Sequence, residues 1–95
     1  MLNLKFSAEV IYWRGPAPFY FAAVPDAQAK KIKAMSSELT YGWGVIPARV
    51  KIGKTEFTTS LFPRDGGYLV PIKAVVRKAE DIDVDDVITI SLFLG

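Results

Sequence analysis

The chain of 95 residues contains no cysteine and no histidine. Without cysteine it can form neither a disulfide nor a thiolate zinc site. Without histidine it lacks the usual general base and the commonest metal ligand, so any catalysis would depend on Asp, Glu, Lys, Tyr or Ser. We therefore expect a protein that is not an enzyme, with no catalytic residues, no metal site and no cofactor.

Long apolar runs are missing as well. No segment approaches the roughly 20 apolar residues that a membrane-spanning helix requires. The first residues, MLNLKFSAEVIYW, alternate between polar and apolar, whereas a signal peptide has a continuous apolar segment. These features predict a cytoplasmic protein without membrane contact. The length and the 51% hydrophobic content predict one small domain over residues 1–95.

The charges are unevenly distributed along the chain. All 12 basic residues precede residue 80, whereas five of the ten acidic residues lie in EDIDVDD at 80–86. Asp81, Asp83 and Asp85 have the spacing of the start of an EF-hand calcium loop. That loop requires Gly at its sixth position and Glu at its twelfth, where this chain has Asp86 and Leu92. We therefore expect a solvated acidic turn.

Periodicity predicts six strands and two helices. A single apolar face repeats every second residue in most of the predicted strands. Proline and aspartate at 25–26 suit the start of a helix, which continues to the loop TYGWG with Gln28, Ile32, Met35 and Leu39 on one face. Pro71 is expected to open a second, short helix that ends near Ala79. The predicted strands cover residues 4–12, 19–24, 45–52, 55–62, 68–70 and 86–94.

The turn Gly53-Lys54 fixes the pairing of the two central strands. Glycine first in a two-residue loop is typical of a type II′ hairpin. The predicted register pairs Ile52 with Thr55, Val50 with Phe57, Ala48 with Thr59, and Ile46 with Leu61. It gathers the apolar side chains on one face and leaves Arg49, Lys51, Glu56 and Thr58 on the other.

An internal repeat organises the chain. Val-Pro occurs at 24–25 and again 46 residues later, each time between a strand and a predicted helix. Repeats over roughly 1–52 and 55–95 would each contain two strands, a helix and a strand. The fold class expected is mainly β with two short helices, a pseudo-twofold duplicated unit that forms a split, AbrB-like β-barrel capped by helices. Each half would cover strand edges of the other, and one chain holds both halves. We therefore expect the barrel core to be monomeric, while larger assemblies of whole barrels remain open.

Three segments carry a family resemblance. FYFAAVP, GWGVIPARVKIGKTEFTTSLFP and GGYLVPIKAVVRKAEDIDVDDVITISL occur in this order and resemble the bacterial family catalogued as domain of unknown function 1905. The resemblance covers nearly all of the chain. One departure is Asp85-Asp86, where the family usually has Gly-Asp. The resemblance implies a split barrel with helical caps and implies no established activity.

The segment 66–90 is also similar to the swapped-hairpin units of AbrB-type transcription factors. The matching residues are Gly66, Val70, Pro71, Arg77, Asp86 and Ile88. Gly67 stands where the DNA-contacting arginine of those factors follows the glycine. Val75 and Val76 stand where their helix carries basic residues. The resemblance therefore implies that the framework is retained and that most of the DNA-contacting charges are absent.

The candidate ligand or nucleic-acid surface combines basic and aromatic side chains. It comprises Tyr41, Trp43, Arg49, Lys51, Lys73 and Arg77. The rings of Tyr41 and Trp43 can stack on a ligand or plug one end of the barrel, and Trp13 beside Arg14 has the same two interpretations. The sequence thus predicts a non-catalytic binding or accessory module whose partner is another protein domain or a small ligand. The alternative is a weak nucleic-acid-binding protein.

Overall fold

A computed structural model of the chain describes residues 2–14, 19–35 and 45–95. Over these residues the fold is mainly β with two helices, as the sequence predicts. The elements in chain order are β1 (Leu2–Trp13), β2 (Phe19–Ala23), α1 (Asp26–Ala34), β3 (Ile46–Ile52), β4 (Thr55–Arg64), β5 (Gly67–Ile72), α3 (Ala74–Glu80) and β6 (Val87–Leu94). None of the helices in this described part is long and apolar enough to cross a membrane.

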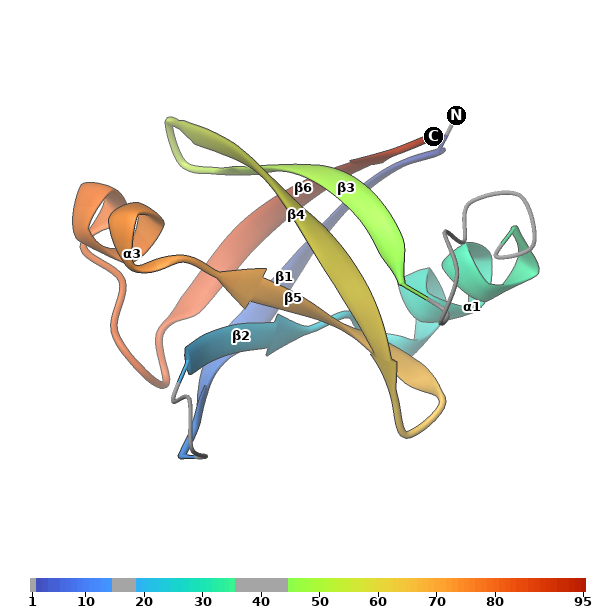
Figure 1. The fold of residues 1–95 in the computed structure, drawn as a ribbon, viewed down its shortest axis with the longest axis horizontal. Coiled ribbons are helices and arrows are strands. Elements are labelled where there is room, and N and C mark those ends of the chain that lie inside the picture. The colour runs from blue at the N-terminus through green and yellow to red at the C-terminus, as the bar shows by residue number, and fades with distance from the viewer. Residues whose placement is uncertain (1, 15–18, 36–44) are drawn as a thin grey trace.

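The strands close into one antiparallel barrel with the order β1-β2-β5-β4-β3-β6, in which β6 pairs again with β1. Two long strands belong to both sides of the barrel. Residues 2–9 of β1 pair with β6 and residues 10–13 pair with β2. In β4, residues 55–61 pair with β3 and residues 62–64 with β5. One chain thus completes the barrel, and the two helices lie on opposite sides of it (Figure 1).

The β3–β4 hairpin has the predicted register. Ile52 pairs with Thr55 and Val50 pairs with Phe57, and the pairing continues to Ile46 and Leu61. Gly53 has a φ of 58°, whereas Lys54 is not among the residues with positive φ, as a type II′ turn requires. Local turn chemistry and the apolar alternation therefore specify the same pairing, which is why this part of the fold follows from the sequence.

The core fills the interior of the barrel with apolar side chains. Burial alternates strictly along β3, because every second residue points inward. Ala29 and Ile32 of α1 and Val76 of α3 join this core from the two helices. The described residues include no buried polar or charged side chain. The interior is therefore packed by the chain itself.

The two Val-Pro steps differ, which corrects one expectation. Pro25 caps α1 directly, as predicted. Pro71 does not open a helix, because it lies within β5, where it pairs with Phe21, and α3 begins only at Ala74. The fixed φ of proline suits an extended strand as well as a first helical turn, so the local sequence did not distinguish the two.

The first helix is also shorter than its periodicity predicts. It ends at Ala34, and its buried residues are Ala29 and Ile32, whereas Gln28 is only partly buried. The predicted continuation to Leu39 lies outside the described residues beyond position 35.

Exchanging the two halves of the chain leaves the ring of strand neighbours unchanged. If β1, β2 and β3 are exchanged with β4, β5 and β6, each neighbouring pair becomes another neighbouring pair of the same barrel. The topology is thus compatible with pseudo-twofold symmetry. An origin by duplication stays a prediction.

Candidate functional site

The outer surface of the barrel has two contrasting halves. One half is formed by β3, β6 and the parts of β1 and β4 that pair with them. Its outward side chains are mostly polar and exposed: Asn3, Lys5, Ser7, Glu9, Arg49, Lys51, Glu56, Thr58, Ser60 and Thr89. Such a face is stable in water without further cover.

The other half is formed by β2, β5 and the ends of β1 and β4, and its outward side chains are mostly apolar. Successive residues of a strand point to opposite sides of the sheet. These side chains therefore point away from the core, into which their neighbours Val10, Ala22 and Val70 point. We call this surface the outer apolar face, and it comprises Ile11, Trp13, Phe21, Ala23, Phe62, Leu69 and Pro71. An apolar face of this kind on the outside of a barrel marks a surface suited to binding.

Two residues of the outer apolar face are buried although they lie outside the barrel core. Phe21 is 4% exposed and Leu69 is 6% exposed, yet neither belongs to the core cluster. Phe21 pairs with Ile11 on one side and with Pro71 on the other, while Leu69 pairs similarly with Ala23 and Phe62. These side chains therefore form a second apolar cluster on the opposite side of the sheet from the core.

A hollow of about 450 Å³ lies over this cluster, which is within the range of ligand pockets. Ile11, Trp13, Phe21 and Leu69 contribute apolar side chains to its wall. Ile11 and Trp13 are 41% and 39% exposed, so the apolar wall is open to solvent. The hollow can accept an apolar group by desolvating these side chains.

Charged groups line the hollow beside the apolar wall. Asp26 is the first residue of α1, and Arg64 is the last residue of β4. Arg64 Nε lies 3.7 Å from Asp65 Oδ2, and both side chains are largely exposed. Such a long, solvated pair contributes little, which leaves the guanidinium able to bind another anion.

A tight turn holds Arg64 at this position. Asp65 and Gly66 form the two-residue loop between β4 and β5, and their φ values are 51° and 80°. Positive φ at both positions is the signature of a type I′ turn, which Asp-Gly favours and which matches the twist of the strands. The turn keeps β4 regular up to Arg64, whose outward side chain then lies beside the apolar wall.

The structure places the predicted basic residues in two groups, one on β3 and the other at α3. Arg49 and Lys51 share the outer face of β3, as predicted. The guanidinium of Arg49 donates to Glu56 Oε1 at 2.8 Å and lies 4.4 Å from the ring centroid of Phe93. Arg49 is therefore already engaged by an anion and a ring from neighbouring strands.

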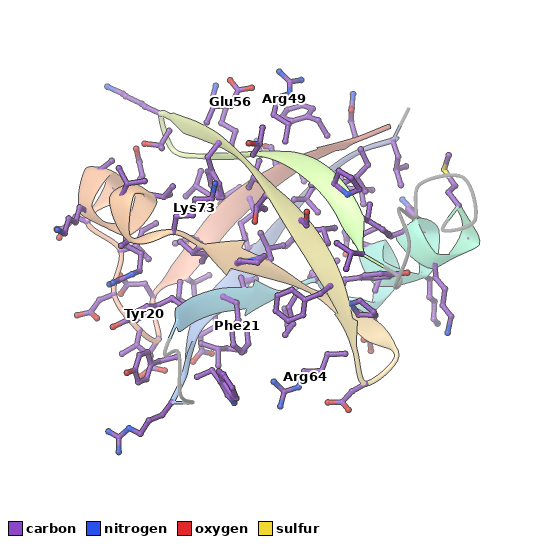
Figure 2. All side chains as sticks on the ribbon, in the orientation of Figure 1. Tyr20, Phe21, Arg49, Glu56, Arg64 and Lys73 are labelled. Carbon is purple, nitrogen blue, oxygen red and sulfur yellow. The ribbon has the colours of Figure 1, made fainter. Side chains whose placement is uncertain are left out.

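The other two predicted cations lie near α3. Lys73 is the exposed residue that precedes the helix, and Arg77 lies within it. The guanidinium of Arg77 lies 3.6 Å from the ring centroid of Tyr20, which in turn is 4.9 Å from the ring of Tyr12. Figure 2 shows Arg49 with Glu56 at the top of the view, Lys73 and Tyr20 at the left, and Arg64 at the bottom. The predicted cations thus lie in two groups, one on β3 and the other at α3.

The remaining predicted site residues, Tyr41 and Trp43, lie outside the described residues. The outer apolar face was not predicted, although the sequence contains a signal for it. The strands FYFAA and GYLVPI carry apolar residues at consecutive positions, whereas β1 and β3 mostly alternate. A strand that is apolar on both faces indicates cover on both faces.

Comparison with protein families places this barrel among known sequences. Residues 6–92 match the family described as domain of unknown function (DUF1905). A comparison with curated proteins finds no match. Since the family match spans nearly the whole chain, as the resemblance in the sequence implied, the protein belongs to the DUF1905 family.

Proposed function

We propose that the protein is a non-catalytic binding module and that its binding site is the outer apolar face. The observation that carries this proposal is the hollow over Phe21 and Leu69, whose wall includes the exposed side chains of Ile11 and Trp13. A sheet face exposed only to water needs polar side chains, as the opposite half of this barrel has. The outer apolar face instead has a hydrophobic cluster with a hollow over it.

The packed interior supports a site on the outside. The core cluster fills the barrel with apolar side chains and leaves the charged groups of the described residues on the surface. Acid–base catalysis generally depends on titratable groups in a shielded site, where burial and neighbours adjust their pKa values. A binding role requires no such groups, and it uses the apolar wall that is present.

The apolar wall also determines what kind of ligand can bind. Recognition depends on the side chains of the outer apolar face. We expect the ligand to present an aromatic or branched aliphatic group, because each 100 Å² of apolar surface removed from water contributes about 2.5 kcal/mol.

An environment-sensitive naphthalene sulfonate dye tests the proposal. The dye carries an aromatic body for the hollow and an anion for Arg64, so its fluorescence should rise on binding to the wild-type protein. Ile11→Asp should reduce this binding at least tenfold, because it introduces a charge into the apolar wall. Val87→Asp is the matched control, since Val87 is a 71% exposed strand residue of the opposite half.

The comparison of the two variants decides the outcome. Circular dichroism should show that both variants retain the fold. If Ile11→Asp and Val87→Asp bind the dye as well as the wild type does, the outer apolar face is not the binding site.

A further inference from the structure

We infer that the group bound by the outer apolar face belongs to a second copy of this chain, so that two barrels pair through these faces about a twofold axis. This inference rests on the proposed function, because it names the partner for the same site. Each barrel is complete within one chain. The dimer therefore forms between finished barrels and does not exchange strands.

The charges around the hollow are complementary to themselves. Arg64 is the cation of the hollow, and Asp26 and Asp65 are its two anions. Asp65 lies beside Arg64 of its own chain at 3.7 Å, which leaves Asp26 as the anion for the Arg64 of a second copy. Two copies can pair face to face about a twofold axis that lies in the plane of the interface, halfway between Arg64 and Asp26. This symmetry places Arg64 of each copy against Asp26 of the other. Two equivalent ion pairs result from one symmetry operation, as in any isologous interface.

The apolar surface is also suited to self-association. Ile11 and Trp13 expose about two fifths of their surface, and they stand beside the hollow rather than apart from it. Each copy therefore offers exposed apolar side chains as well as a concave apolar wall. Pairing would remove both from water and surround them with charged groups, which is the usual arrangement of an interface core and rim.

Other surfaces of the described residues are less suited to this pairing. The polar half of the barrel carries exposed charges over most of its outer face. Val75, Val84 and Val87 are exposed as well, but none of them lines the hollow. Single exposed apolar residues are ordinary in folded proteins.

Sedimentation velocity of the purified chain tests the inference with two charge-reversal variants. The wild type should change from monomer to dimer as its concentration rises toward about 1 mM, where even weak complexes are populated. Arg64→Glu places two acidic groups opposite each other in its own dimer, and Asp26→Lys places two basic groups opposite each other. Each variant alone should therefore dissociate at least tenfold more readily than the wild type.

The decisive experiment mixes the two variants. In the mixed dimer, Glu at 64 of one copy meets Lys at 26 of the other, while the unchanged Asp26 and Arg64 form the second pair. An equimolar mixture should therefore regain the dimer affinity that each variant alone has lost, and a misfolded variant could not produce this result. Lys5→Glu, on the polar half, is the control for a general charge effect and should dimerise like the wild type.

Three results would overturn the inference. They are a wild type that stays monomeric up to about 1 mM, single variants that dimerise normally, and a mixture that does not regain the dimer. Measuring dye binding distinguishes a failure of the dimer inference from a failure of the proposed function. If the wild type stays monomeric but binds the dye in an Ile11-dependent manner, the face is a binding site whose partner is not a second copy.

Discussion

Gly53 lies in the turn of the β3–β4 hairpin, next to Glu80 of helix α3. The loss of stability on replacing it can be estimated from the structure. With a φ of 58° at the first position of a type II′ turn, Gly53 has a backbone conformation that other residues rarely adopt, and an alanine held in it costs about 1–3 kcal/mol. A Cβ at this position would also overlap the carboxylate of Glu80. That carboxylate accepts a 2.5 Å hydrogen bond from Thr55 Oγ1, and the bond is partly buried.

Gly53→Ala should therefore displace Glu80 as well as strain the turn. A hydrogen bond to a charged group contributes about 1.5–3 kcal/mol, so the two effects together predict a loss of about 2.5–6 kcal/mol in the free energy of unfolding. In a Glu80→Ala background the carboxylate is already absent. There the same substitution should cost only the conformational part, about 1–3 kcal/mol.

Urea unfolding followed by far-ultraviolet circular dichroism measures the four proteins of this double-mutant cycle. The predicted result is a coupling of at least about 1.5 kcal/mol between positions 53 and 80, the lower limit of the hydrogen-bond contribution. If Gly53→Ala costs the same in both backgrounds, the proposed contact between the turn and α3 does not operate. A neutral effect in both backgrounds would refute the assigned turn conformation as well.

Two further substitutions have defined expectations. Phe21→Ala removes a buried ring outside the barrel core and should lower the free energy of unfolding by about 3 kcal/mol in urea titrations; a loss below about 1 kcal/mol would mean that this second apolar cluster adds little stability. Arg49→Ala removes an ion pair whose side chains are both about half exposed, together with a contact over Phe93, and should cost at most about 1–2 kcal/mol. The same Arg49 variant should leave dye binding unchanged, because Arg49 lies on the polar half of the barrel.

The elements that the sequence predicted well are those specified by local constraints. In the β3–β4 hairpin, the glycine turn and the alternation of apolar residues give the same register, so no distant contact is required. In β6, the alternation of Ile88, Ile90, Leu92 and Leu94 indicates one inward face, and the last three of these residues are buried. Pro71 was placed in a helix because proline suits both structures, and the choice depends on β2, which pairs beside it.

The candidate site was harder to predict because it is assembled from distant segments. Trp13, Phe21 and Arg64 come from three strands, and the barrel order places them around one hollow. Charge alone was a poor guide to which residues lie together. Arg49 and Arg77 were grouped by their charge, but one is engaged by Glu56 and Phe93 and the other lies over Tyr20.

The central claim is that the outer apolar face is covered when the protein binds its partner, and the fluorescence of Trp13 tests it most directly. The chain contains two tryptophans, so Trp43→Phe leaves Trp13 as the sole reporter. Trp13 is 39% exposed in the single chain, so acrylamide should quench its emission readily at low protein concentration. As the concentration rises through the range of dimer formation, the account predicts a shift of emission to shorter wavelength and a decrease in quenching of at least twofold. Dimer formation without any change in the emission or quenching of Trp13 would contradict it.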